Sequence, residues 1–175
     1  IIGVTTDREG LRSKVSAILH NKMFGTGFIG NFAFYLLFGV ILAYSPLYAR
    51  QNLHFTDELV SALFLLYYVS TTIMRFSIGR ITSREKISKP ALVFISIAFA
   101  ALFSFTLAIT ANNLVFACIF ALIGAVQGVI FPVGSMLIAQ HVQPSRNVLA
   151  NSLFMMGIDI GQGIAPLITA GVVIQ

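Results

Sequence analysis

Charged side chains are scarce in this sequence. Of its 175 residues, 10% are Asp, Glu, Lys or Arg, and 57% are hydrophobic. A soluble domain usually carries about 25% charged residues. Because so little polar surface is available, the chain cannot cover a globule in water, and we expect lipid to surround most of it.

Side chains that carry chemistry are also scarce. The single cysteine, Cys118, lies inside an apolar run, so it can build neither a disulfide framework nor a metal-ligand set. Three histidines fall in expected loops or at helix ends, none with metal-ligand spacing: His20, His54 and His141. No nucleophile–base pair is visible. We therefore expect no metal or cofactor, and an integral membrane enzyme is a less favoured alternative.

A cleavable leader and a nucleic-acid partner are likewise not indicated. The opening IIGVTTDREG lacks a charged segment followed by an apolar core, so it is no signal peptide and looks like the middle of something longer. The net charge is +5, yet the basic residues lie between apolar runs and form no basic face interleaved with aromatics. We expect no nucleic acid as a partner.

Long apolar runs are what the sequence does contain. Each is long enough for the roughly 20 residues of a helical bilayer crossing, and none alternates with a period of two. The runs cover residues 24–48, 58–80, 91–111, 113–139 and 148–174. Only a helix satisfies its own backbone in hydrocarbon. The sequence predicts an all-α polytopic membrane protein with five helices and a leading linker over 1–23.

The basic residues predict an orientation. Nine of the 11 fall in three segments that share one side if the helices alternate: 1–23, 80–90 and 140–147. The other side has only Arg50, which Asp57 and Glu58 offset. Because basic loops stay in the cytoplasm, we place these three segments there, in a protein of the plasma membrane.

Two charges remain inside the predicted spans. Asp159 falls near the centre of the last helix, and Arg75 lies five residues before the basic loop at Arg80. A charge at a helix centre costs about 2.5–3.5 kcal/mol on insertion scales, and such residues mostly face a bundle interior or a watery path. Arg75 could instead snorkel towards the interface on its long stem. Asp159 has no such escape, which leaves a structural polar contact as its alternative.

Polar and small residues accompany these charges at helical spacing. Four of the five helices carry such a stripe, whereas the helix over 91–111 has only Ser and Thr and is expected at the lipid side. Together with Asp159 and Arg75, the candidates for a solute or proton pathway are Gln127, Gln162, Asn31, Tyr35 and Tyr68. The glycines, such as Gly124 and Gly128, are explained as well by close helix packing.

Three stretches resemble the C-terminal half of the major facilitator superfamily, in its drug-efflux-like or sugar-efflux-like members. They read YYVSTTIMRFSIGRITSREKISKP, GAVQGVIFPVGSMLIAQHVQPSRNVLANSLF and DIGQGIAPLITAG. The first is similar to the family's eighth helix and its basic loop, in which Gly79, Arg80, Arg84 and Lys86 are taken as the loop motif. Ser83 stands where the pattern has Asp, and Glu85-Lys86 stands where Phe-Gly is common, which weakens the gating contacts expected of this loop.

The resemblance implies that the five spans correspond to the seventh to eleventh helices of a twelve-helix fold. The chain is then a fragment, or a half whose partners are the N-terminal half and the last helix of the same transporter. The implied function is secondary transport of a small solute by alternating access, as proton-coupled efflux, with protons as the coupling ion. Asp159 would be the proton carrier or the counter-ion of a cationic solute. A non-transporting membrane scaffold is the alternative function.

Overall fold

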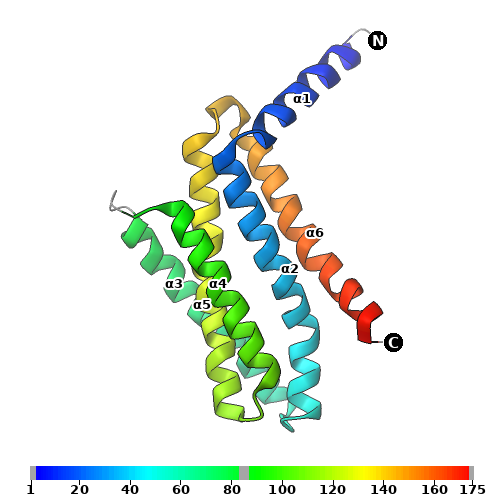
Figure 1. Ribbon diagram of the computed structural model, residues 1–175, viewed down its shortest axis with the longest axis vertical. Helices are drawn as coiled ribbons and strands as arrows, with labels where there is room; N and C mark the ends of the chain where they lie inside the picture. The colour runs from blue at the N-terminus through cyan, green and yellow to red at the C-terminus, as the bar shows by residue number, and fades with distance from the viewer. Residues whose placement is uncertain (1–2, 83–86, 174–175) are drawn as a thin grey trace.

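Long helices make up the chain. The structure, a computed structural model, describes residues 3–82 and 87–173. Its α-helices are α1 (Gly3–Leu19), α2 (Lys22–Gln51), α3 (Asp57–Thr82), α4 (Lys89–Ile109), α5 (Asn113–His141) and α6 (Asn147–Val173), with a short 3-10 turn, η1 (Pro144–Arg146), before α6. No strand occurs in these two ranges. Five of the helices are long and apolar enough to cross a membrane, which confirms the predicted all-α polytopic class (Figure 1).

One further helix, α1, lies within the segment predicted as a linker. It leans away from the bundle at the end where α2 begins (Figure 1). Leu11 and Leu19 are exposed on it, whereas Ile18 is buried against the bundle. Within this segment residues 3–19 are therefore helical, and the assignment of 1–23 to the cytoplasm stays a prediction.

Asparagine side chains start two of the spanning helices. The carboxamide oxygen of Asn21 accepts hydrogen bonds from the backbone N–H groups of Met23 and Phe24, and Asn112 caps α5 in the same way. The first N–H groups of a helix have no partner within the helix, and such caps satisfy them. The Asn21 amide nitrogen also donates to the carbonyl of His141 at 2.8 Å, which ties the start of α2 to the end of α5.

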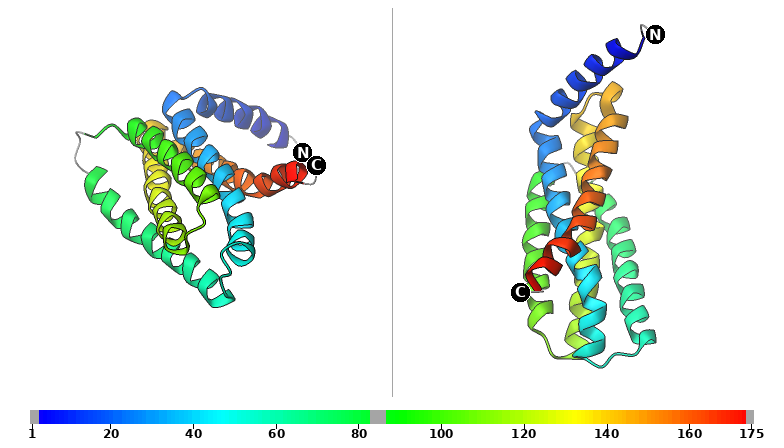
Figure 2. Two further views of the ribbon diagram at one scale, coloured as in Figure 1. Left: turned by 60° about the horizontal axis from the view of Figure 1, so that its bottom comes forward. Right: turned by 90° about the vertical axis from the view of Figure 1, so that its right-hand side faces the viewer.

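The packing of the spanning helices leaves one face of the bundle open. α2 and α5 pack against each other at the centre, α3 packs on α5, and α6 packs on α2. α4 lies against both α2 and α5 and covers one side of the central pair (Figure 2). Large side chains of α3 and α6 away from these contacts are exposed, including Tyr68 and Met155. Among the described helices, none covers the side of the central pair opposite α4.

Glycines set the closest approaches between helices. A methyl group added at Gly124 or Gly128 of α5 would collide with the backbone carbonyls of Tyr67 and Thr71 in α3. In the same way, a methyl at Gly39 of α2 would meet the carbonyl of Gln162 in α6. Small residues are what allow transmembrane backbones to pack this closely. The polar side chains of α3 and α5 are thereby brought within hydrogen-bonding distance.

Candidate functional site

A buried hydrogen-bond network joins the three helices α2, α3 and α5. The carboxamide oxygen of Gln127 accepts a bond of 2.7 Å from the Tyr67 hydroxyl and one of 3.3 Å from the Thr71 hydroxyl. Its amide nitrogen donates to the Tyr35 hydroxyl oxygen at 3.2 Å. All four side chains are buried. Because an unpaired polar group is costly in a dry interior, this network fixes the three helices relative to one another.

Arg75 lies beside this network on α3. Its guanidinium carbon is 5.1 Å from the centroid of the Phe131 ring of α5, a cation–π contact. The Arg75 side chain is exposed, and it forms no hydrogen bond or ion pair with another described residue. Its five N–H groups therefore remain available to a ligand.

Asp159 lies near the middle of the 27-residue helix α6. Gly157, Gly161 and Ala165 form the buried side of α6, and Asp159 projects away from it and is exposed. It makes no ion pair with Arg75, because the one salt bridge among the described residues joins Arg50 to Asp57 at 3.0 Å. Arg75 nevertheless lies one helical turn from Thr71, whose hydroxyl bonds to Gln127. Asp159 lies between Gly157 and Gly161, which pack on Phe28 and Phe32 of α2. The structure thus gathers Asp159, Arg75, Tyr35 and Gln127 from four helices into one region.

The other predicted pathway residues lie in different surroundings. Asn31 is fully buried in the seam between α2 and α5, where its amide nitrogen donates to the carbonyls of Gly27 and Ile130 at 3.0 and 3.2 Å. Its carboxamide oxygen has no hydrogen-bond partner. Tyr68 is 55% exposed and packs edge-on to Tyr67, and Gln162 is half-buried beside α2. Tyr68 is thus open to a ligand, Gln162 lies where α6 packs on α2, and Asn31 holds α2 and α5 together.

The residues of the basic loop pattern lie at the end of α3. Gly79 and Arg80 are exposed in its last turn. Arg84 and Lys86 lie outside the described residues. The contacts predicted for this loop therefore stay a prediction.

Tyr67 and Thr71 were missing from the predicted pathway residues, although both bond to Gln127. Their sequence signal is weak, because a tyrosine or threonine in an apolar span often packs or bonds back to its own helix. Thr71 does bond to the Tyr67 carbonyl at 2.9 Å, but it reaches the Gly124 carbonyl of α5 at the same distance. The second contact depends on how closely α3 and α5 approach, which helical spacing alone does not give.

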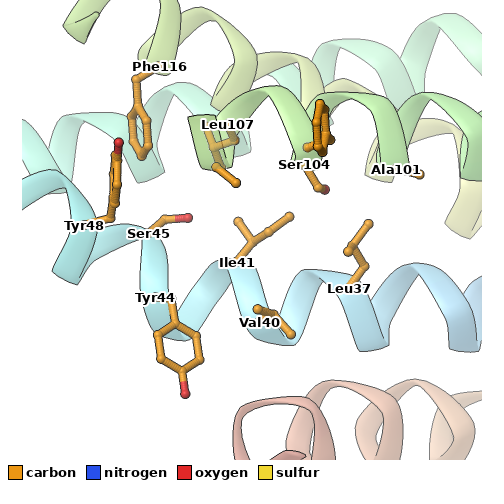
Figure 3. A pocket seen from close by; sticks show the side chains of 12 residues that line it. Leu37, Val40, Ile41, Tyr44, Ser45, Tyr48, Ala101, Ser104, Leu107 and Phe116 are labelled. Carbon is orange, nitrogen blue, oxygen red and sulfur yellow. The ribbon is translucent and has the colours of Figure 1, made fainter. Parts of the chain in front are cut away.

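An apolar cavity lies away from these polar residues. It has a volume of about 500 Å³ and opens between α2 and α4. Leu37, Ile41 and Leu107 line it, and Tyr44 and Tyr48 lie at one end (Figure 3). Its lining is almost wholly apolar, and the Tyr48 hydroxyl is bonded to the Thr110 carbonyl at 3.0 Å. This groove is a feature of the side covered by α4, not of the polar region.

A comparison with known protein families decides the identity of the fold. The profile of the Major Facilitator Superfamily matches residues 5–174. The chain belongs to this superfamily. Comparison with curated proteins and with solved structures finds no match.

Membership of the Major Facilitator Superfamily agrees with the resemblance drawn from the sequence. The superfamily consists of transporters that carry small molecules across lipid membranes. With its five apolar helices, this member is an integral membrane protein. The polar region shared by α2, α3, α5 and α6 is its candidate functional site.

Proposed function

We propose that this superfamily member is a proton-coupled secondary transporter that exports a small solute by alternating access, as an antiporter. In this proposal the face opposite α4 meets a second helical bundle, the N-terminal half of the transporter, and the solute passes between the two. The protein lies in the plasma membrane with residues 1–23, 80–90 and 140–147 in the cytoplasm. Rocking of two bundles around a site near the midplane is the general mechanism of such carriers.

The observation that supports this function is an acid without a partner inside a spanning helix. Asp159 lies near the middle of α6, and no described residue pairs with it. A carboxyl group holds a proton more readily where water is scarce and releases it where water is plentiful. An acid that meets water first on one side and then on the other therefore suits the task of carrying a proton.

The separation of Asp159 from Arg75 also supports the proposed coupling of solute transport to proton movement. An acid already paired with an arginine would resist protonation, because the neighbouring positive charge favours the carboxylate. Here the guanidinium is stacked on Phe131 and does not contact the acid. Asp159 is thus free to exchange a proton, and Arg75 is free to contact a solute.

The test is the variant Asp159→Asn in the full-length gene product. The protein is reconstituted in vesicles, offered a mixture of solutes, and assayed by mass spectrometry with and without a proton gradient. We expect the variant to insert and to keep its thermal stability, but to lose all gradient-dependent solute movement.

Asp57→Asn is the matched control, since Asp57 is an exposed acid paired with Arg50 at the start of α3. It should transport like the parent protein. Gradient-dependent transport that persists unchanged in Asp159→Asn would show that Asp159 is not the proton carrier.

A further inference from the structure

The hydrogen bonds around Gln127 have a direction that can be worked out from burial. Tyr67 is completely buried, so its hydroxyl proton needs an acceptor within the protein. The Gln127 oxygen, 2.7 Å away, is that acceptor. Turning the carboxamide over would place its nitrogen against Tyr67 and leave that proton without a partner. The amide nitrogen therefore points to Tyr35.

This direction leaves Tyr35 with a free proton. Its hydroxyl oxygen accepts from Gln127 at 3.2 Å, and no described residue accepts the Tyr35 proton in turn. Of the two tyrosines bonded to Gln127, Tyr35 is the more exposed, at 6% against 0% for Tyr67. The network thus runs from the fully buried hydroxyl of Tyr67, through Gln127, to the Tyr35 hydroxyl, whose proton can still be donated.

A second set of unused donors lies close by. The guanidinium of Arg75, stacked on Phe131, has no hydrogen-bond partner among the described residues. Arg75 lies one helical turn from Thr71, and Phe131 one turn from Gln127, the residue that bonds to both Thr71 and Tyr35. Two groups with unused donors, one of them positively charged, favour a ligand with oxygen acceptors. A carboxylate suits them best, because charge-assisted hydrogen bonds are the strongest.

We propose that Tyr35 and Arg75 together bind an oxyanion, best a carboxylate, on an apolar or aromatic solute, and that Gln127 is the positioning residue that orients Tyr35. This proposal rests on the proposed secondary transport, not on the antiport direction given there, and names the solute class. The Phe131 ring and the exposed Tyr68 offer apolar surface for the body of such a solute.

Asp159 must be included in the charge balance of this site. Its negative charge opposes an anion near Tyr35, and protonation removes that opposition. The other charged or titratable groups here are Arg75, Tyr67 and Tyr68 of α3 and Tyr35 of α2, while α5 contributes the neutral Gln127 and Phe131. Binding of the anion is therefore favoured when Asp159 carries a proton, so an anionic solute would cross together with the proton, and the antiport direction of the proposed function would not apply to it.

The test measures binding at equilibrium, without a proton gradient. Naphthylacetate, its neutral amide naphthylacetamide and the cation naphthylethylamine share one aromatic body and serve as probes. Each is titrated calorimetrically into the full-length gene product in detergent at one mildly acidic pH. We expect the parent protein to bind naphthylacetate most tightly and the amine least tightly.

Tyr35→Phe removes the donor while keeping the ring. It should weaken naphthylacetate binding about tenfold, and naphthylacetamide less, because a hydrogen bond to a charged acceptor is worth more than one to a neutral acceptor. Tyr44→Phe is the matched control: it is the same change on the same helix, but Tyr44 lies at one end of the apolar groove between α2 and α4, with its ring turned away from α4 (Figure 3). It should leave the three affinities unchanged.

Two further variants separate the roles. Gln127→Met should lower the preference for the acetate over the amide, since Tyr35 loses its fixed orientation, and a purely structural role would lower both affinities alike.

Asp159→Asn should keep or strengthen acetate binding even though it abolishes coupled transport, so that failure of this proposal and failure of the transport function can be told apart. The proposal is overturned if the parent binds none of the probes, if it prefers the amine, or if Tyr35→Phe leaves the acetate-to-amide ratio unchanged.

Discussion

Single glycines decide whether the polar network can form. Gly124 lies where α5 crosses α3, and the Thr71 hydroxyl donates to its carbonyl at 2.9 Å. The space that a side chain would need at Gly124 is occupied by the Tyr67 backbone. Any side chain here would push α3 away from α5 and lengthen the bonds that converge on Gln127.

We expect Gly124→Ala to lower the free energy of unfolding by about 1–3 kcal/mol, the usual cost of overpacking a tight contact. Titration of the purified protein with sodium dodecyl sulfate, followed by circular dichroism, measures it. Gly163→Ala on α6 is the control, because a methyl group there meets nothing within 4 Å. Equal stability of the two variants would contradict the role given to Gly124.

For single residues, the sequence predicts the helix face on which a side chain lies better than its hydrogen-bond partner. Helical spacing placed Tyr35, Gln127 and Arg75 together, and the structure does bring them together. The same spacing placed Asn31 with them, but its amide bonds to the Ile130 carbonyl inside the α2–α5 seam. An amide suits a watery path and a helix–helix bond equally well, and only the distance between the helices separates the two.

Whole helices were more predictable than their contacts. Hydrophobic length gave the five spans, and the observed ends differ from the predicted ones by a few residues at most. The helical form of α1 was not predicted, because its residues are too polar and irregular to show a membrane-spanning run. Capping residues fix where the helices begin, as at Asn21, whose side chain caps α2 and also bonds to the end of α5.

Asn21→Ala should therefore lower the free energy of unfolding by more than the loss of a helix cap alone. Loss of the cap accounts for about 1 kcal/mol, and loss of the bond to the His141 carbonyl adds about 0.5–1.5 kcal/mol. Asn112→Ala removes a cap alone and should cost only the first amount. Differential scanning fluorimetry of the two variants side by side gives the comparison. A smaller loss in Asn21→Ala than in Asn112→Ala would argue against the link between α2 and α5.

The whole molecule has two unlike sides. Towards α4 the central pair of helices is covered and apolar, and on the opposite side Arg75, Asp159 and Tyr68 are exposed. A lipid-facing surface does not tolerate such charges, so this second side calls for a polar or protein surface against it. The sequence predicted this division from the plain apolar composition of the α4 segment.

Orientation in the membrane is a property of the whole molecule as well. In a Cys118→Ala background, we expect a cysteine placed at Ser145, in the turn before α6, to react with an impermeant maleimide only from the cytoplasmic side. A cysteine placed at Asn52, after α2, should react only from outside. Labelling of intact cells and of inverted vesicles distinguishes the two. The opposite pattern would reverse the assignment drawn from the basic segments.

The groove between α2 and α4 also matters for handling the protein. A void on the lipid-facing side of a bundle forfeits dispersion contacts unless something fills it. In a bilayer, acyl chains can enter this opening of about 500 Å³ and pack against the side of α2 that faces α4. Extraction into a short-tailed detergent removes that packing from the helix that carries Tyr35. Long-tailed detergents or nanodiscs are therefore the suitable media for purification, and a loss of ligand affinity in octyl glucoside would reflect an emptied groove, not a damaged site.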